Sequence, residues 1–504
     1  MSQKFKQRYS EYKEIMQKAA DLNYASAVLG WDQEVYMPPK GVSARSRQLA
    51  TLAAEAHRIL TSDQLGNLLE ELMAIPHTPE FDTEITNVLL TRYDFERNKK
   101  LPGSFVEELS VLTSTGFNSW LDARNKNDYK IFAPILEKLI NLKRRQADLL
   151  GYSEHPYNAL LNEYERGATV SMLDPIFNEI KIQFPILLNS ILNGRMVSND
   201  CFHQHLDKQQ QFDFSIDVLK GMGYDFEAGR LDYSEHPFTT SFSSSDVRIT
   251  SRVDEHNFAS MLWSCIHEGG HGLYEQGLPE SQYGLPLGEA ASLGIHESQS
   301  RLWENCIGRG KEFWDYYFPL LQQKFPAQFK NVSHSEFLNA CNLVSPSLIR
   351  TEADEATYHF HVMIRYELEK ALLDRSLKPA DLPCAWNDLY RKYLGIMPTD
   401  DKTGVLQDVH WSHGMFGYFP TYTLGSFYAV QFFEQAEKEI ANLNAKIAAG
   451  NFTELLQWLR AKIHIHGRRF TSEELCQKIT GKKLDPSVFL SYASKKYNGI
   501  YGRN

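Results

Sequence analysis

The chain has 504 residues, of which 42% are hydrophobic and 23% are charged, a composition that fills a large core and argues against disorder. Its 53 basic and 63 acidic residues give a formal net charge of −10, and without a long basic run this argues against general nucleic-acid binding. The length allows two or three domains, or one large helical domain.

Six cysteines are scattered singly and no CxxC pair occurs, so we expect neither a cysteine-rich zinc module nor a disulfide framework. The first twenty residues, MSQKFKQRYSEYKEIMQKAA, are polar and amphipathic and lack the apolar core of a signal peptide. No stretch approaches the roughly 18 apolar residues that span a bilayer. We therefore expect a soluble, reduced protein in the cytoplasm.

Most of the chain repeats its apolar residues every three or four positions, the spacing of helices that bury one face. Proline and glycine mark the breaks between these segments, and we find no internal repeat, low-complexity tract or long linker. The pattern therefore predicts a mainly α protein. It is clearest at residues 105–112, 131–142, 364–372 and 427–433.

Residues 236–253 break the helical rule. Their sequence, HPFTTSFSSSDVRITSRV, is rich in Thr, Ser, Phe and Val, and DVRIT alternates as a strand does. We expect a small β element here, either an ordinary structural hairpin or an edge to which extended substrate adds a strand. Asp246 and Arg248 point to one face of this strand, where a structural salt bridge is as good an interpretation as a catalytic role.

The strongest chemical signal follows in SCIHEGGHGLYEQG, on a helix expected over residues 256–276. His267 and His271 are four residues apart, so both imidazoles lie on one helical face and can reach the same tetrahedral Zn²⁺. Glu268 lies beside them and can take a proton from metal-bound water. The alternative is a helix with two exposed histidines. The apolar residues before the motif favour a buried helix, and Gly269–Gly270 favour close approach of a ligand or a neighbouring helix.

A catalytic zinc ion needs a third protein ligand and one open position. A second helix, expected over residues 287–306, carries Glu297 26 residues after His271, a gap that suits one loop and a return helix. Metallopeptidases with HExxH and a glutamate on a second helix share this layout. Spacing alone leaves Glu289 and Glu304 as competitors, of which Glu304 fits a structural partner better.

Beyond the zinc motif, several blocks of sequence resemble the carboxypeptidase Taq family of metallocarboxypeptidases. The blocks occur in order over most of the chain, whose length is also that of the family, so the resemblance is far more specific than HExxH alone. They are WDQEVYMPP (Trp31–Pro39), HPF (His236–Phe238), DVRIT (Asp246–Thr250), HEGGH (His267–His271), HESQSR (His296–Arg301), IRTEAD (Ile349–Asp354), GVLQDVHW (Gly404–Trp411) and YFPTYTLG (Tyr418–Gly425).

The resemblance implies a large helical zinc-peptidase fold with a deep substrate groove and a small β-sheet bordering it, as one catalytic domain over residues 1–504. It implies a homodimer that removes single residues from peptide C-termini with broad specificity, using one zinc or cobalt ion per chain. Nucleic acid and membranes are not expected partners. Arg301, four residues after Glu297, stands where many zinc peptidases of this layout carry an acidic residue. The group that orients the far nitrogens of the two histidines is therefore left open.

A carboxypeptidase also needs a base, an oxyanion donor and an anchor for the terminal carboxylate of its substrate. Glu268 is the natural base for a zinc-bound water. The resemblance favours Tyr422 as the oxyanion donor, because a phenol can donate a hydrogen bond to the developing alkoxide. Tyr418 is the near rival, and a packed ring with a tethered hydroxyl is the ordinary alternative for either tyrosine.

We expect the anchor to be an arginine, because its planar fork binds a carboxylate with two hydrogen bonds. Arg350 is the first choice, against a structural ion pair with Glu352 or Asp354. The resemblance also places His410 and His236 beside the groove, where either could donate to the carbonyl or carboxylate of the substrate. A satisfied core histidine is an equal alternative for each.

Three functions remain to be compared. The leading hypothesis is a cytoplasmic, zinc-dependent metallocarboxypeptidase that trims short peptides. An oligopeptidase that cuts internal bonds would use the same zinc site, and Arg350 distinguishes the two because only a carboxypeptidase needs a cationic anchor for a terminal carboxylate. The third is a helical binding or scaffold protein with a vestigial zinc site, against which the base Glu268 argues.

Overall fold

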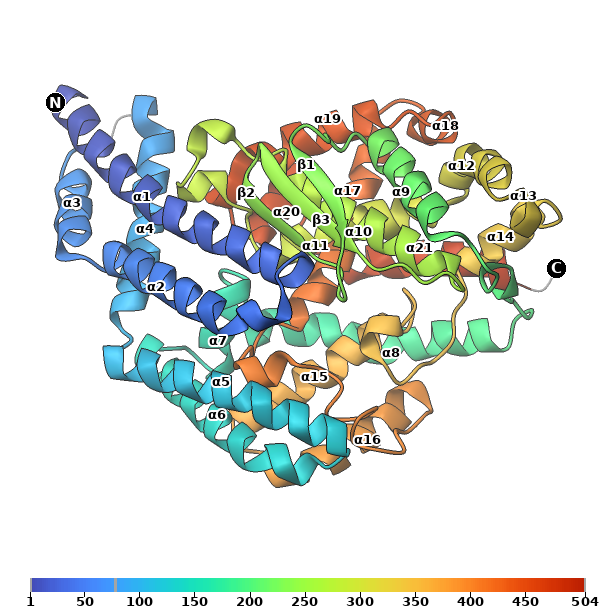
Figure 1. The fold of residues 1–504 in the computed structure, drawn as a ribbon, viewed down its shortest axis with the longest axis horizontal. Coiled ribbons are helices and arrows are strands. Elements are labelled where there is room, and N and C mark those ends of the chain that lie inside the picture. Colours follow the sequence, from blue (N-terminus) through green and yellow to red (C-terminus); the bar gives the residue numbers. More distant parts are fainter. Residues whose placement is uncertain (1, 77–78, 503–504) are drawn as a thin grey trace.

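The computed structural model of the protein describes residues 2–76 and 79–502. These residues form helices along most of their length and one small sheet of three strands (Figure 1), which confirms the expected mainly α fold. Among the residues described, no helix is long and apolar enough to cross a membrane.

The regular structure described before residue 229 consists of helices. Its longest helix packs against the second along the chain, and the fifth packs against the sixth at the bottom of the view in Figure 1. The helices of this part are α1 (Ser2–Val35), α2 (Val42–Leu60), α3 (Asp63–Met73), α4 (Asp82–Lys99), α5 (Gly103–Lys126), α6 (Tyr129–Leu150), α7 (Tyr157–Tyr164), α8 (Val170–Leu192) and α9 (Lys208–Met222).

The sheet interrupts the helices after α9. It consists of β1 (Gly229–Tyr233), β2 (Thr239–Ser243) and β3 (Asp246–Ser251), in the order β1-β3-β2, with β1 parallel and β2 antiparallel to β3. Two of these strands fall in the segment 236–253 where a β element was predicted, whereas β1 precedes it. Val247 and Ile249 are fully buried against α10 (Phe258–Glu275), and β2 occupies an edge of the sheet.

The chain after the sheet is helical again, and three of its segments position the site described below. Helix α11 (Leu293–Arg301) packs against both α10 and α17, and it continues into a π-helical segment at Leu302–Gly308. The further helices are α12 (Lys311–Lys324), α13 (Pro326–Phe329), α14 (His334–Cys341), α15 (Tyr358–Leu373), α16 (Leu382–Leu394), α17 (Pro420–Glu439), α18 (Leu443–Ala448), α19 (Thr453–Lys462), α20 (Ser472–Thr480) and α21 (Pro486–Tyr501).

The bounds of the two expected zinc helices differ at their starts. Helix α10 fills most of the expected 256–276, because Asn257 caps its N-terminus by accepting a hydrogen bond from the backbone N–H of Ala259. Helix α11 begins six residues later than the expected 287, since Pro286–Gly288 forms a separate 3₁₀ turn and Ser292 provides the cap. This cap fixes where the short helix α11 begins and therefore which of its side chains face α10.

Candidate metal centre and active site

The part of α10 before the two histidines is largely buried. Met261, Cys265 and Ile266 there are fully inaccessible to solvent. The glycines within the motif allow two neighbouring helices to approach. A Cβ at Gly270 would lie 2.6 Å from the Cα of Ser300 in α11, and one at Gly269 would lie 2.4 Å from Leu219 in α9. The cost of glycine in a helix is thus offset by close packing of α11, the helix that delivers the third side chain.

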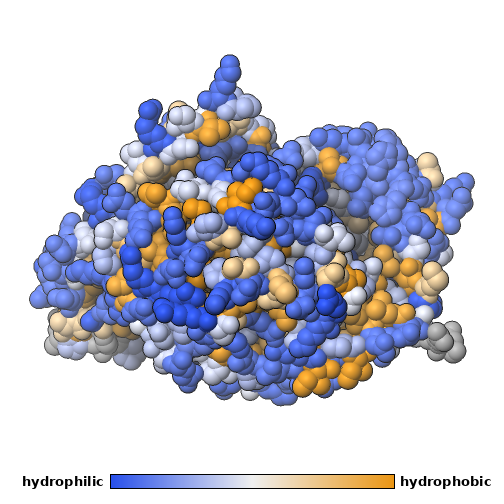
Figure 2. All heavy atoms as spheres, turned by 90° about the horizontal axis from the view of Figure 1, so that it is seen from below, coloured by the Kyte–Doolittle hydropathy of each residue, from blue (hydrophilic) through white to orange (hydrophobic). Residues whose placement is uncertain are grey.

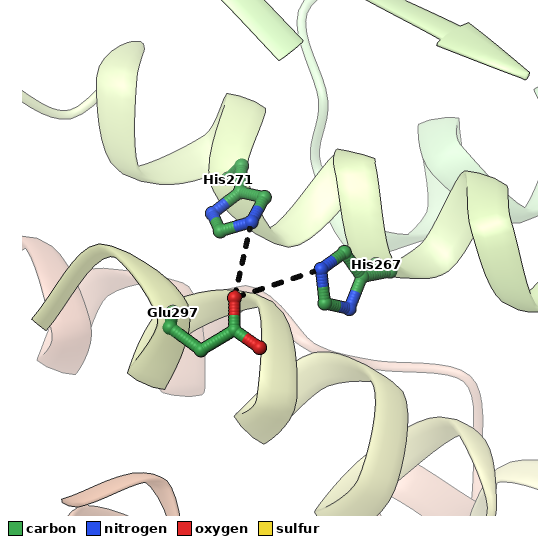
Figure 3. Close-up of side chains that lie close together, drawn as sticks. All are labelled: His267, His271 and Glu297. Atoms are coloured by element: carbon green, nitrogen blue, oxygen red, sulfur yellow. Dashed lines mark ion pairs between the residues drawn. The ribbon is translucent and has the colours of Figure 1, made fainter. Parts of the chain in front are cut away.

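His267, His271 and Glu297 converge between α10 and α11 (Figure 3). One carboxylate oxygen of Glu297 lies 3.8 Å from Nε2 of His267 and 3.7 Å from Nε2 of His271. Two atoms bound to one zinc ion at about 2.0–2.1 Å lie roughly 3.4 Å apart in a tetrahedron, and the three possible ligand atoms here all lie within 4.8 Å of one another, so a small inward movement of these side chains would let them share one ion. Burial also lowers the pKa of His271 well below its ordinary value, which keeps this imidazole in the neutral form that binds metal.

Neither of the two competing glutamates belongs to the cluster of possible metal ligands. Glu289 forms an ion pair with Arg468, 2.9 Å away. Glu304, in the π-helical segment, accepts a hydrogen bond at 2.9 Å from Nδ1 of His267, the nitrogen that faces away from Glu297. Glu304 therefore takes the orienting position that the sequence left open, and it fixes which nitrogen of His267 is available to a metal.

Arginines hold both carboxylates in place. Arg301 donates from Nε to Glu297 at 2.7 Å and from Nη1 to Glu304 at 3.3 Å, and Arg309 donates to the other oxygen of Glu304 at 2.9 Å. Burial alone would raise the pKa of Glu304, but the charges of Arg301 and Arg309 and the bond from His267 bring it far below its ordinary value. Arg301 thus links the third candidate ligand to the residue that orients the first.

Glu268 is buried beside the two histidines, where burial raises the pKa of its carboxyl. Its Oε2 accepts a hydrogen bond at 2.6 Å from the hydroxyl of Thr239, on the edge strand β2. The carboxylate is therefore held between the metal helix and the sheet, a position that suits a general base. Thr239 belongs to the predicted β element, but no pattern in the sequence singled it out.

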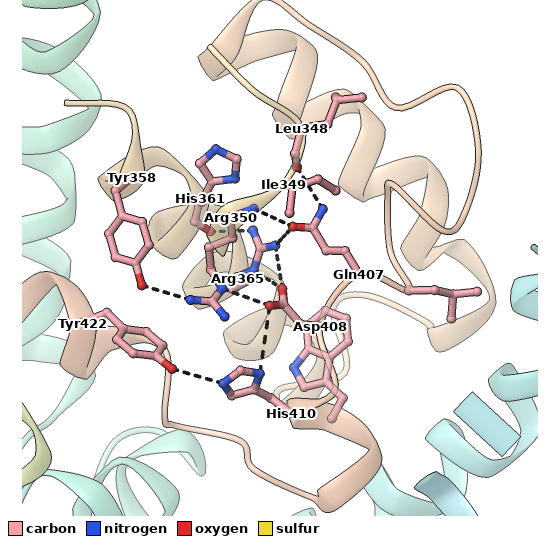
Figure 4. A network of polar contacts seen from close by, with 12 residues as sticks. Leu348, Ile349, Arg350, Tyr358, His361, Arg365, Gln407, Asp408, His410 and Tyr422 are labelled. Carbon is pink, nitrogen blue, oxygen red and sulfur yellow. Dashed lines mark hydrogen bonds and ion pairs between the residues drawn. The ribbon is translucent and has the colours of Figure 1, made fainter. Parts of the chain in front are cut away.

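Arg350 lies in a buried polar network (Figure 4) and is only 6% exposed. Its Nε donates to Asp408 and its Nη1 to the hydroxyl of Tyr358, both at 2.9 Å. The ion-pair partner is thus Asp408, and neither Glu352 nor Asp354 takes that role. Asp408 also pairs with Arg365, which is fully buried. Burial would raise the pKa of Asp408, but the two arginines hold it far below its ordinary value.

His410 and Tyr422 belong to the same network, joined by a contact of 3.3 Å between Nε2 and the phenol oxygen. Burial and the charge of Arg350 lower the pKa of His410 to about 3, so its imidazole is neutral near pH 7. The guanidinium of Arg350 lies 4.9 Å from the centre of the Tyr422 ring. The rival Tyr418 stacks at an angle on Tyr422, with ring centres 5.3 Å apart.

His236 does not join this group. Its side chain is exposed and forms no hydrogen bond or ion pair with the residues that the structure describes. Asp246 and Arg248 form a salt bridge at 2.9 Å, and the Arg248 guanidinium lies 4.4 Å from the centre of the Trp31 ring. This geometry favours the structural interpretation of that pair.

Sequence reasoning missed Asp408 and Arg365, which fix the guanidinium of Arg350. Asp408 stands in GVLQDVHW, two residues before His410, so its motif offered a signal. Arg365 stands inside α15 among apolar residues, and a charged residue on the buried face of a predicted helix is itself a sign of a partner.

Comparisons with known proteins identify the family. The family model described as Carboxypeptidase Taq (M32) metallopeptidase matches residues 11–497. The chain is 41% identical to thermostable carboxypeptidase 1 of Thermus thermophilus over 98% of its length and 99% of the relative's, and 38% identical to carboxypeptidase 1 of Bacillus subtilis over 97% and 98%. Its fold superposes on the crystal structure of the M32 carboxypeptidase from Deinococcus radiodurans with a TM-score of 0.96, at 37% identity, covering 99% of this chain and 100% of that one. The chain belongs to the carboxypeptidase Taq (M32) family of metallopeptidases.

Proposed function

We propose that this metallocarboxypeptidase removes single residues from the C-termini of short peptides with broad specificity, using one zinc ion held by His267, His271 and Glu297. The carrying observation is a chain of contacts from the metal site to a cationic anchor. Arg301, bonded to Glu297, lies 4.6 Å from the centre of the Tyr358 ring, and the hydroxyl of Tyr358 accepts a bond from Arg350. An arginine this close to the metal site supports recognition of a terminal carboxylate, which an endopeptidase does not need.

Zinc bound there would act as a Lewis acid and lower the pKa of a coordinated water to about 7. Glu268 takes the proton of the attacking water and passes it to the leaving amine. The hydroxyl of Tyr422 donates to the oxyanion, and His410 lies within reach to orient that hydroxyl. Arg350, held on one side by Asp408 and Tyr358, presents the rest of its fork to the substrate carboxylate.

The family supports four further proposals. Cobalt substitutes for zinc at the same three side chains, which carry the nitrogen and oxygen donors that both ions accept. Residues 1–504 act as one catalytic domain, and two chains form a homodimer, which analytical ultracentrifugation tests. The enzyme works in the cytoplasm, which fractionation of the source cells tests.

One experiment tests the activity. The zinc-loaded protein is incubated with one short peptide as the free acid and as the C-terminal amide, and the products are followed by mass. We expect stepwise loss of single residues from the acid only, abolished by a chelator. Internal cleavage of both forms would show the oligopeptidase, an alternative that the carboxypeptidase relatives do not favour. Zinc binding without cleavage of either form would show a binding protein.

A further inference from the structure

The short helix α7 lies between the part of the molecule that carries the metal helices and the part that carries α5, α6 and α15 (Figure 1). A buried carboxylate stands next to each of its ends. Glu165 follows its last residue and is 2% exposed, and the fully buried Glu369 of α15 accepts a hydrogen bond from Tyr157, the first residue of α7. Neither carboxylate touches the three candidate metal ligands, and the proposed mechanism uses neither.

Glu165 holds the start of the helix that delivers Glu297. Its Oε2 accepts a hydrogen bond at 3.0 Å from the backbone N–H of Gly294, one turn before Glu297. Its Oε1 accepts from Ser472, whose hydroxyl lies 2.7 Å from that of Ser292, the N-cap of α11.

Glu165 packs tightly against the first turn of α11. A Cβ at Gly294 would lie 2.4 Å from Oε2 of Glu165, so the carboxylate touches the helix backbone itself. Helix α11 has only nine residues, and a displacement of its first turn therefore moves Glu297 with it. Through this contact the end of α7 fixes the position of the third candidate metal ligand.

Glu369 holds the turn that carries the substrate-binding side chains. Its Oε1 accepts a hydrogen bond from the indole of Trp411, and its Oε2 accepts one from the backbone N–H of Gly417, each at 2.8 Å. Trp411 follows His410, and Gly417 precedes Tyr418. One carboxylate thus binds the turn at both ends, and it uses both of its oxygens to do so.

Helix α7 also contacts this turn directly. Gly417 has φ of +96°, and a Cβ there would lie 2.8 Å from the backbone carbonyl of Leu160, in the middle of α7. The turn therefore rests on α7 at Gly417 and on Glu369 through Tyr157. At the other end of α7, Glu165, the residue that follows the helix, contacts the start of α11.

We propose that α7 fixes the position of the metal-binding half of the site relative to its substrate-binding half. We refer to this role of α7 as the strut. Glu165 is the positioning residue for Glu297, and Glu369, tied to Tyr157, is the positioning residue for the segment from His410 to Tyr422. This inference rests on the proposed function, because it assigns zinc to one half and the peptide carboxylate to the other.

A crossed pair of variants tests the strut. Glu165→Gln and Glu369→Gln each keep the size of the side chain. Glu369→Gln turns an amide nitrogen toward the N–H of Trp411 or of Gly417, and Glu165→Gln replaces one of the two acceptor oxygens that hold the start of α11. For Glu165→Gln we expect zinc affinity, measured by competition with a chromophoric chelator, to fall about tenfold, with KM for a free-acid peptide within about twofold of wild type at saturating zinc. For Glu369→Gln we expect the reverse: unchanged zinc affinity, and kcat/KM lower by about tenfold.

Glu355→Gln is the matched control, since this buried carboxylate is held by Lys496 and Tyr497 at α21 and touches neither half of the site. It should leave zinc affinity and KM within about twofold of wild type, whatever it does to thermal stability. If a glutamine variant fails to fold, Ser472→Ala replaces Glu165→Gln and Tyr157→Phe replaces Glu369→Gln, with the same expected split.

The proposal for α7 is overturned if the two variants do not affect different quantities. Glu165→Gln would then change KM as well as zinc affinity, and Glu369→Gln would change zinc affinity as well as kcat/KM, as general destabilisation does, or both variants would leave all these quantities unaltered. Failure of the proposed function is a separate outcome, because it would appear in the wild-type protein as absent zinc binding or absent release of C-terminal residues. The variants are compared only with a wild type that shows both.

Discussion

The carboxylate of Glu268 is held away from bulk water by the hydroxyl of Thr239 on one side and by the metal helix on the other. A carboxylate in this position removes a proton without belonging to the metal-ligand set, so catalysis and metal binding are separable here. Glu268→Gln should lower kcat about 10³-fold while the zinc content of the purified protein stays at that of wild type. Loss of zinc from this variant would contradict its role as a base.

The guanidinium of Arg350 can be removed without leaving an unpaired buried charge, because Asp408 keeps its ion pair with Arg365. Arg350→Ala should therefore fold, and it should lower kcat/KM on free-acid peptides by about 10- to 100-fold, the value of one or two charged hydrogen bonds. Residual cleavage of C-terminally amidated peptides should stay at the wild-type level. Equal losses on both substrates would mean that Arg350 has a structural role only.

The phenol of Tyr422 is the group that distinguishes transition-state stabilisation from packing. Tyr422→Phe keeps the ring against Arg350 and removes only the hydroxyl near His410. We expect kcat to fall about 10²- to 10³-fold with little change in KM, whereas Tyr418→Phe serves as the matched control and should cost far less. A kcat for Tyr422→Phe within twofold of wild type would refute the assignment.

At the scale of elements, the packing of α11 between α10 and α17 sets the metal geometry. A Cβ at Gly425 of α17 would lie 2.5 Å from both the Cβ and the Cγ of Glu297. Gly425→Ala should displace Glu297 from its present position relative to the histidines and weaken zinc binding by at least about tenfold, measured by chelator competition. Gly499→Ala in α21 is the control, because nothing lies within 4 Å of the added methyl group and zinc affinity should not change.

The same elements show how much of the fold and of the site the sequence alone predicts. Helix α10 and strand β3 were predictable because their apolar residues repeat at the local period of a helix or a strand. Glu297 could be ranked above Glu289 and Glu304 from one loop and a return helix, although only the structure separates the three. Strand β1 was missed because it depends on parallel pairing with β3, a contact made only in the folded chain.

Partners within the site were the least predictable. The bond from His267 to Glu304 depends on a π-helical segment, whose wider turn no periodicity reveals. Asp408 and Arg365 approach each other from segments 43 residues apart. A sequence shows which residues carry chemistry, whereas the identity of a hydrogen-bond partner depends on how distant elements pack.

At the scale of the whole molecule, buried histidines outside the metal site make stability depend on pH, among them His359, His361, His410 and His464. Burial lowers the pKa of His359, His410 and His464 to about 3 each, against about 6.5 in an unfolded chain. The folded protein therefore leaves them neutral at pH values where the unfolded chain protonates them. Their contribution to stability is complete above pH 6.5 and is lost as the pH falls toward 3.

Below pH 6.5 each such histidine makes the free energy of unfolding fall by about 1.4 kcal/mol per pH unit, or about 2 kcal/mol by pH 5. The variant His359→Gln should remove the contribution of one histidine to this pH dependence, so that its free energy of unfolding declines less steeply than that of wild type between pH 6.5 and 5. The measurement is urea unfolding across this range in excess chelator, so that release of metal from His267 and His271 adds nothing to the slope. The double variant that also carries His464→Gln should remove the contributions of two histidines. Parallel slopes in all three proteins would mean that these imidazoles take up protons inside the folded core.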